Sequence, residues 1–132
     1  MNNVEVVEAF MNAINSHDLA RLSNLMTENH IFIDSLGNSV KGRDKMIAGW
    51  KQYFAFCPDY WLSHDEFLER DTLVAVFGAA GGTVAAQGEL PIENKWRVTA
   101  AWLAKVENGR VKEWRVYADN KHVYEILSAR RL

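Results

Sequence analysis

The hydrophobic pattern of this chain changes its period near residue 60, and that change restricts the fold to one that keeps helices and strands in separate parts of the sequence. Before residue 60, apolar residues recur at the spacing of an amphipathic helix, first at Val4, Val7, Phe10, Met11 and Ile14. After it, apolar and polar residues alternate with period two along 60–69, 72–82, 95–107 and 110–118, as in strands. Helices followed by strands predict an α+β fold with an antiparallel sheet.

Short local signals place the ends of several elements. Asp18 is suited to cap a short second helix, because its side chain can accept a hydrogen bond from the first turn. A third helix is expected between Gly42 and Pro58. Asn108 and Gly109 are the strongest hairpin signal in the chain, because both residues tolerate positive φ. A final short helix is expected to reach Leu127.

The composition fits a single domain over residues 1–132 and excludes several classes of protein. An apolar content of 48% supports one hydrophobic core. With 15 basic and 17 acidic residues, the chain lacks the basic excess of a nucleic-acid-binding protein. No stretch approaches the roughly 20 apolar residues of a membrane helix, and residues 1–8 do not resemble a signal peptide. The single cysteine, Cys57, rules out an intrachain disulfide, so we expect a cytoplasmic location.

The sequence also argues against a metal or a cofactor. The four histidines have none of the spacings that are typical of metal sites. Gly78, Gly81 and Gly82 are not followed by a helix, so they do not form a phosphate loop, and a bend or bulge in a curved sheet explains them better. We therefore expect no bound metal and no cofactor.

The order of the elements and the residues 12–46, 57–78 and 100–120 resemble the nuclear transport factor 2-like superfamily, and within it the SnoaL-like polyketide cyclase branch. The resemblance implies a cone-shaped, curved antiparallel sheet wrapped around the N-terminal helices, the cystatin-like or SnoaL-like fold. A pocket between such a sheet and its helices is a usual place for a small-molecule site. The superfamily includes isomerases, cyclases, epoxide hydrolases, dehydratases and non-catalytic proteins, so each catalytic position needs its own test.

Asp34, in the segment 32–37, is the principal candidate for catalysis. The resemblance aligns it with the general base of ketosteroid isomerases. Alternation also places Asp34 on the same strand face as Phe32, whose apolar side chain favours an inward direction. A carboxylate in an aromatic-lined cavity is suited to proton transfer near neutral pH. The alternative is a turn residue that accepts hydrogen bonds from the backbone of 35–37.

Other positions depart from the catalytic patterns of the superfamily. The tyrosine that donates to the oxyanion in the isomerases is matched by Phe10, and their second acid falls at or next to Ala101. Isomerisation that depends on this donor pair is therefore not expected. The strand that holds an Arg/Asp pair in limonene epoxide hydrolases matches 73–82, which has no ionisable residue, and their other aspartate is matched by Val116. That chemistry is also disfavoured.

The remaining candidate residues are aromatic, with one histidine. We expect the substrate pocket to be lined by Phe32, Trp50, Tyr53, Tyr60, Trp114 and Val116. His64 is the candidate for a second catalytic group, because an unperturbed imidazole titrates near physiological pH, although alternation leaves its direction open. His30, on the face of Asp34, is the weaker alternative.

In two of the expected strands, 95–107 and 110–118, apolar residues occur at positions on both faces of the sheet. If Trp114 and Val116 face the pocket, as the resemblance implies, we expect Trp96 and Trp102 on the opposite face, with the direction of Trp61 left open. A sheet with two apolar faces must be covered on both. In this superfamily the second cover is typically another subunit, so we expect a homodimer through the outer sheet face.

Two functions follow from this reading. The first is a cofactor-independent enzyme in which Asp34 exchanges a proton on a small apolar, carbonyl-bearing metabolite, with Tyr53, Tyr60 or His64 as polar helpers. The second is a binding or dimerisation module that holds an apolar ligand without converting it. An inward acid favours the first function, and the missing oxyanion donors favour the second.

Overall fold

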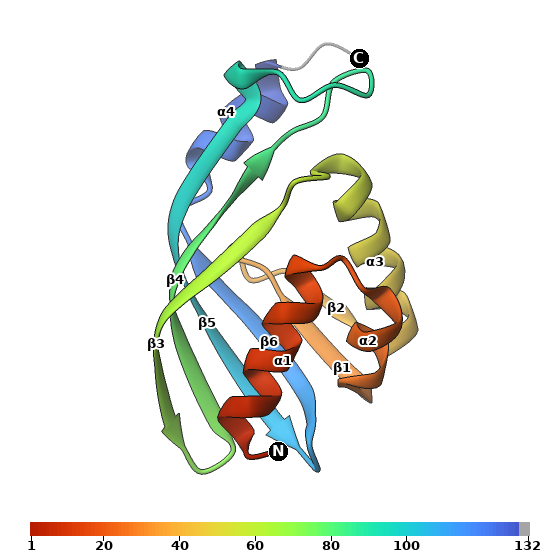
Figure 1. Ribbon diagram of the computed structural model, residues 1–132, viewed down its shortest axis with the longest axis vertical. Helices are drawn as coiled ribbons and strands as arrows, with labels where there is room; N and C mark the ends of the chain where they lie inside the picture. Colours follow the sequence, from red (N-terminus) through yellow and green to blue (C-terminus); the bar gives the residue numbers. More distant parts are fainter. Residues whose placement is uncertain (130–132) are drawn as a thin grey trace.

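The computed structural model describes residues 1–129, which form four α helices and six strands (Figure 1). The helices are α1 (Asn3–Asn15), α2 (Leu19–Asn24), α3 (Arg43–Phe56) and α4 (Lys121–Ala129). The strands are β1 (Met26–Ile33), β2 (Ser39–Lys41), β3 (Trp61–Arg70), β4 (Leu73–Thr83), β5 (Lys95–Glu107) and β6 (Arg110–Ala118), and a short 3-10 helix, η1 (Ile92–Asn94), precedes β5. The α+β class is confirmed. Residues 130–132 of the predicted domain lie outside the described range.

Helices α1 and α2 begin where the sequence supplies side-chain caps. Asn2 and Glu5 form a reciprocal capping box at the start of α1, and Asp18 accepts a hydrogen bond from the Arg21 amide at the start of α2. The inner face of α1 is buried in the core, through Val6, Val7, Ala9, Phe10, Met11, Ala13 and Ile14. None of the described helices combines the length and apolar content needed to cross a bilayer.

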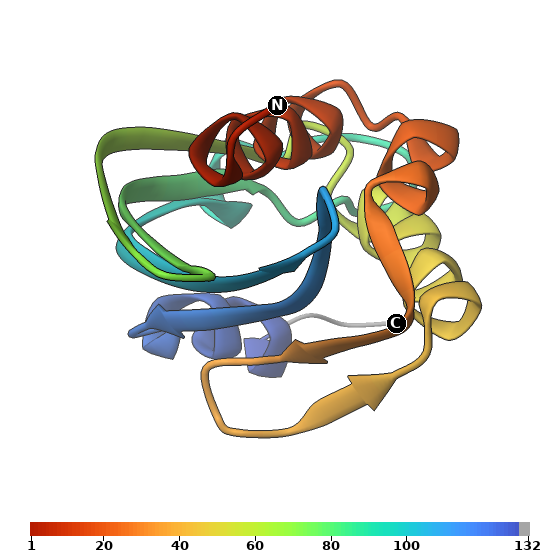
Figure 2. The same ribbon diagram turned by 90° about the horizontal axis from the view of Figure 1, so that it is seen from below.

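The sheet is strongly curved, and α1, α2 and α3 lie on its concave side (Figures 1 and 2). The strand order is β2-β1-β6-β5-β4-β3. All neighbouring strands are antiparallel except β1 and β6, which are parallel. The curved antiparallel sheet expected from the sequence is therefore present, with one parallel pair at which strands from the two halves of the chain meet without a direct turn.

The edge of the sheet near β1 also differs from expectation. The strand on which the sequence analysis places Phe32 is β1, which begins at Met26 and whose register with β6 is irregular between Met26 and Ile31. The short strand β2 was not expected at all. It pairs with β1 because the Asp34 and Asn38 backbones close the intervening turn, with a hydrogen bond of 2.9 Å from the Asp34 amide to the Asn38 carbonyl.

Two glycine positions agree with the sequence-based expectations. Asn108 and Gly109 have φ values of 51° and 76°, and they connect β5 directly to β6 as a tight hairpin. Gly78 pairs with His64, next to an irregularity in β3 between His64 and Glu66. A Cβ atom at Gly78 would overlap the Ser63 carbonyl oxygen, so only glycine permits this close approach at the bulge.

The expected division of the tryptophans between the two sheet faces is wrong. Trp102 pairs with Val116, and Ala104 pairs with Trp114, so Trp102 and Trp114 project to the same face. Their rings stack at 6.0 Å, and Trp96 follows on this concave face by alternation along β5. Trp61 lies on the outer face, where the Arg97 guanidinium is 5.9 Å from its ring centroid.

Candidate functional site

A cavity of about 370 Å³ lies between the concave face of the sheet, α3 and α4. All six residues that the sequence assigns to a substrate pocket line it, namely Phe32, Trp50, Tyr53, Tyr60, Trp114 and Val116. Trp96 and Trp102 line it as well, because they lie on the concave face of the sheet and not on the outer face. The cavity therefore has mainly aromatic and aliphatic walls.

Trp50 is the central residue of the wall contributed by α3. It is 4% exposed, and its ring lies 6.2 Å from Phe32 of β1 and 6.3 Å from Tyr60, the residue before β3. Phe54, one turn further along α3, stacks on the same indole at 5.4 Å. The helix thus presents Trp50 and Tyr53 at the three-residue spacing that aims both side chains at the sheet.

Tyr53 and Tyr60 form a pair of phenols on one side of the cavity. Their rings are nearly perpendicular, at 82°, with centroids 4.8 Å apart. Burial raises the pKa of both residues, and for Tyr53 the neighbouring Tyr60, Cys57 and Tyr124 raise it further. Both side chains therefore remain protonated. Neither hydroxyl has a hydrogen bond within the described residues, so both O–H groups are free to donate into the cavity.

Two indole N–H groups lie beneath the cavity surface. Trp50 Nε1 and Trp96 Nε1 are buried and have no hydrogen-bond partner in the described part of the chain. The Trp96 side chain also acts on Cys57, where it opposes the increase in the thiol pKa to about 12 that burial causes first and Asp59 second. Neither N–H group is therefore open to a ligand in the cavity.

Asp34 lies in the turn between β1 and β2, and it also lines the cavity. Its Oδ1 accepts hydrogen bonds of 2.9 Å from the amides of both Leu36 and Asn38, which hold the turn between β1 and β2. Its side chain also lines the cavity, and Oδ2 has no hydrogen bond among residues 1–129. The two interpretations of Asp34 from the sequence are therefore compatible, because each uses a different carboxylate oxygen.

The structure does not bring either candidate histidine into the cavity. His64 lies in β3 with Nε2 3.9 Å from Glu8 Oε2 of α1, and it does not line the cavity. His30 is fully buried in the core, where its Nδ1 lies 2.7 Å from the Val111 carbonyl oxygen. Burial lowers the pKa of His30, while the hydrogen bond to Val111 and the charge of Glu113 partly oppose that shift.

The positions of the isomerase oxyanion donors also lie outside the cavity. Phe10 is fully buried in the core, with its ring 5.0 Å from that of Trp114. Ala101 pairs with Phe77 and Tyr117, which are exposed on the outer face. The cavity donors are instead Tyr53 on α3 and Tyr60, which directly precedes β3. The sequence indicated Tyr53 and Tyr60 as polar helpers, and both line the cavity.

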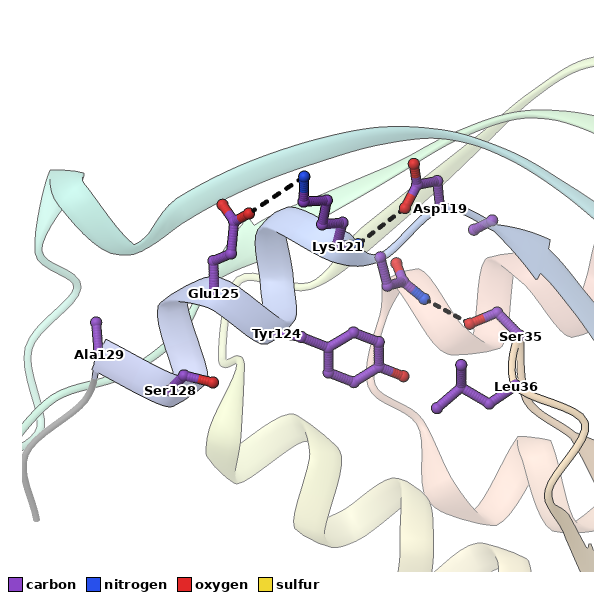
Figure 3. Close-up of a pocket in the computed structure, with 10 residues that line it drawn as sticks. Ser35, Leu36, Asp119, Lys121, Tyr124, Glu125, Ser128 and Ala129 are labelled. Atoms are coloured by element: carbon purple, nitrogen blue, oxygen red, sulfur yellow. Dashed lines mark hydrogen bonds and ion pairs between the residues drawn. The ribbon is translucent and has the colours of Figure 1, made fainter.

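A surface groove adjoins the cavity at α4 (Figure 3). Ser35, Ala118, Asn120 and Tyr124 line both the groove and the cavity, so they form the neck between them. Asn120 Nδ2 donates to Ser35 Oγ at 3.0 Å across this neck. The sequence analysis missed Asn120 and Tyr124. The only signal for them was the four-residue spacing of Val123 and Leu127, which turns α4 towards the cavity.

The charge of the site is low. Asp34 is the one charged residue among the described residues that line the cavity. Within residues 1–129, no group of three or more histidine, cysteine, aspartate or glutamate side chains could hold a metal ion. The site can therefore offer an apolar enclosure, neutral donors and one carboxylate.

A curved sheet that encloses an aromatic cavity with three N-terminal helices and a C-terminal helix defines a class of small α+β domains, the cone-shaped SnoaL/NTF2-like fold. The sequence profile of the SnoaL-like domain matches residues 7–114, and this chain belongs to that family. No curated protein matches the sequence.

Solved structures agree with this fold at low sequence identity. A proposed SnoaL-like polyketide cyclase from Shewanella putrefaciens CN-32 superposes with a TM-score of 0.82 at 17% identity, covering 98% of both chains. IdmH, a proposed polyketide cyclase from Streptomyces antibioticus, gives 0.79 at 21% identity, with 98% of this chain and 100% of that chain covered. An LEH-like epoxide hydrolase from M. tuberculosis gives a TM-score of 0.78 at 13% identity, covering 96% of this chain and 89% of that chain. At these identities the likeness establishes the fold.

Proposed function

We propose that this protein binds a small, mostly apolar carbonyl compound in its cavity and transfers a proton on it, as an isomerase, cyclase or lyase, with Asp34 as the base and without a cofactor. The observation that carries this proposal is the position of Asp34 Oδ2, which is unbonded in a cavity with otherwise uncharged walls. A carboxylate oxygen without a protein hydrogen bond, at the wall of an apolar cavity, is a suitable base for a carbon acid.

The proposed step uses one oxygen of Asp34. A C–H bond next to the carbonyl breaks, its proton goes to Oδ2, and the electron pair moves into the carbonyl group as an enolate. Return of the proton from Oδ2 to another carbon completes an isomerisation. In a cyclisation, the enolate carbon attacks a second carbonyl, and the alkoxide formed there takes the proton from Oδ2, which restores the carboxylate. Oδ1 stays bound to the Leu36 and Asn38 amides and keeps the carboxylate oriented.

Two further observations support a small-molecule function. The structural neighbours include proteins described as proposed polyketide cyclases and one described as an LEH-like epoxide hydrolase. The cavity also has a neck that joins it to a groove on the surface, which gives a ligand a route to Asp34 past Ser35 and Asn120.

A second candidate function is ligand binding without conversion. It is favoured by the absence of donors at Phe10 and Ala101, the positions that matter for enolate stabilisation in related isomerases. Under this alternative, Asp34 serves the β1–β2 turn only.

Exchange of carbon-bound hydrogen separates the two functions. We would incubate the protein with 2-tetralone in D₂O and follow deuterium incorporation next to the carbonyl by NMR. Proton transfer by Asp34 predicts that the wild type accelerates exchange and that Asp34→Asn loses this acceleration while its affinity for 2-tetralone changes little. Asp65→Asn, in exposed β3, is the matched control and should behave as the wild type. Binding without accelerated exchange would support the second function.

We further propose that two copies associate through the outer sheet face, in the cytoplasm. Phe77, Ala101 and Tyr117 are neighbours across three strands of this face, and Phe77 and Tyr117 are 43% and 49% exposed. Leu68 on β3, 55% exposed, extends the same apolar surface. Exposed apolar surface of this kind on a sheet is typical of an interface. The unpaired Cys57 supports a reducing compartment.

A further inference from the structure

We propose that His17 is a positioning residue for the cavity, which fixes the Tyr60 phenol and the Trp50 ring from behind the cavity wall. His17 lies in the turn between α1 and α2, and it does not itself line the cavity. The inference rests on the proposed function, because the positioned phenol serves the ligand of that function. It assigns a role in this function to a side chain outside the cavity.

The backbone of His17 has a conformation that normally belongs to glycine. The His17 amide donates to the Ile14 carbonyl and the Asp18 amide donates to the Ala13 carbonyl, and together these bonds form a Schellman motif at the end of α1. Glycine is the usual residue at this point of the motif, where φ is positive, and His17 has a φ of 53°. The imidazole is therefore held here against the preference of the backbone, and contacts of the side chain must offset the strain.

Two contacts of the imidazole provide this offset. Its Nε2 lies 3.1 Å from the Tyr60 carbonyl oxygen, and because a carbonyl oxygen can only accept, Nε2 carries the proton and donates. The ring also lies flat against the Phe54 ring, with centroids 4.0 Å apart and planes 5° from parallel. One side chain thus holds both helix α3 and the residue that directly precedes β3.

Both contacts lead to the cavity wall. Phe54 also stacks on Trp50, at 5.4 Å, and Trp50 and Tyr60 line the cavity with their ring centroids 6.3 Å apart. The Tyr60 amide donates to the Cys57 carbonyl at 3.0 Å, so the imidazole binds the second backbone group of the same residue. His17 therefore restricts the positions of the two cavity rings relative to each other.

Asn15 binds β3 two residues further on, and this contact separates positioning from folding. Its Nδ2 donates to the Leu62 carbonyl at 2.9 Å, and its Oδ1 accepts from the Leu62 amide at 2.8 Å. Because β3 is an edge strand, these bonds take the place of a neighbouring strand at its start. Asn15 therefore keeps β3 attached to α1 without the imidazole, and substitution of His17 is expected to act on Tyr60 and not on the fold.

Fluorine NMR of protein labelled with 3-fluorotyrosine tests the inference without a ligand. The Tyr60 signal is the one of four tyrosine signals that disappears in Tyr60→Phe. We expect His17→Gly, which suits the backbone but has no imidazole, to shift or broaden the Tyr60 signal and to leave the Tyr117 signal in place. His17→Gln should return the Tyr60 signal towards its wild-type position, because the amide nitrogen can replace Nε2 as the donor.

Binding of 2-acetylnaphthalene, measured by equilibrium dialysis, tests whether His17 acts through Tyr60. His17→Gly should weaken binding about fivefold, which is the effect of about one hydrogen bond. In a Tyr60→Phe background, the same substitution should change the affinity little, because the phenol that it misplaces is already absent. Asp71→Gly is the matched control and should change neither measurement, since Asp71 has a φ of 55° in the exposed turn between β3 and β4.

Two results would overturn the inference. One is an unchanged Tyr60 signal in His17→Gly, and the other is an equal loss of affinity in the wild-type and Tyr60→Phe backgrounds, which a purely structural role predicts. The circular dichroism spectrum and melting temperature verify that each variant folds. If the wild type binds the ketone but does not accelerate exchange in 2-tetralone, the proposed catalysis fails, while a shifted Tyr60 signal still supports the role of His17.

Discussion

Cys57 Sγ occupies the space that a side chain at Gly82 would need. The thiol is fully buried, and the adjacent Asp59 accepts hydrogen bonds from Thr83, at 2.6 Å from its amide and 2.7 Å from its hydroxyl. These contacts join the loop after α3 to the end of β4. Because Tyr60 follows directly in this loop, the same contacts position one of the cavity donors.

The contact between Cys57 and Gly82 predicts non-additive mutations. Gly82→Ala should lower the free energy of unfolding by about 1–3 kcal/mol, as overpacking does. In a Cys57→Ala background the same substitution should be less destabilising, by about 0.5–3 kcal/mol, because the obstructing sulfur is gone. Urea unfolding of the four proteins of this cycle measures the difference. Strict additivity would show that the Asp59 carboxylate and the Tyr60 backbone, and not the thiol, limit the space.

His30 predicts that the protein loses stability on the acid side. Its pKa is lowered in the folded state, first by burial, so the unfolded chain binds the proton more readily. The free energy of unfolding should therefore fall as the pH drops below about 6.5, by at most about 1.4 kcal/mol per pH unit for this one group. Protonation would place an N–H at Nε2, which is buried and has no hydrogen-bond partner in the described residues.

Urea unfolding between pH 5 and 7.5 measures this dependence. His30→Gln should flatten the profile in that range, whatever its own effect on stability. The matched control is His122→Gln, because His122 is exposed on α4. Equal slopes for His30→Gln and the wild type would assign the acid sensitivity to another group.

The hydrogen bond between Asn120 and Ser35 predicts control of ligand entry. Asn120→Ala removes the 3.0 Å contact across the neck and should lower the free energy of unfolding by about 1 kcal/mol. Ligand association and dissociation should both become faster, with a smaller change in affinity. Stopped-flow binding of 2-acetylnaphthalene measures these rates, and Lys121→Ala, which removes an exposed ion pair with Glu125, is the control. Unchanged rates would place the ligand route elsewhere.

We predict that the outer apolar surface forms a dimer and that a single charged substitution on it disrupts this dimer. The wild type should have about twice the 15.1 kDa mass of one chain in light scattering at micromolar concentration. Phe77→Lys should shift it to the mass of a monomer, because the charge would be buried without a partner. Ile92→Lys is the control, since Ile92 is 84% exposed in the connection between β4 and β5. A monomeric wild type would contradict the proposed association.

Local chemistry explains which parts of the fold could be predicted. The cap at Asp18, the hairpin at Asn108 and Gly109, and the spacing of Trp50 and Tyr53 depend on a few neighbouring residues, and the structure agrees with each. The expected lining residues also occupy the cavity wall, because the inward positions of β1, α3 and β6 follow from alternation and helical periodicity. Whether those residues bind a ligand stays a prediction.

The errors arise where long-range register decides the outcome. Alternation shows that Trp96 and Trp102 share a face, but only the pairing of Trp102 with Val116 shows which face it is. The parallel contact of β1 with β6 and the short strand β2 likewise depend on partners distant in sequence or on turn closure. His64 could not be oriented either, because a bulge interrupts the alternation of β3 next to it.

The pairing of β1 with β6 also constrains how the protein reaches its working state. Phe32 is made early in synthesis, but its strand partner Trp114 is made near the end, so this closure links distant parts of the chain and is expected to be slow. Until β6 arrives, Asp34 has no fixed position relative to the opposite wall of the cavity. Competence to bind a ligand should therefore emerge in the last folding phase, and a ligand present at that moment would act as a template for the final closure.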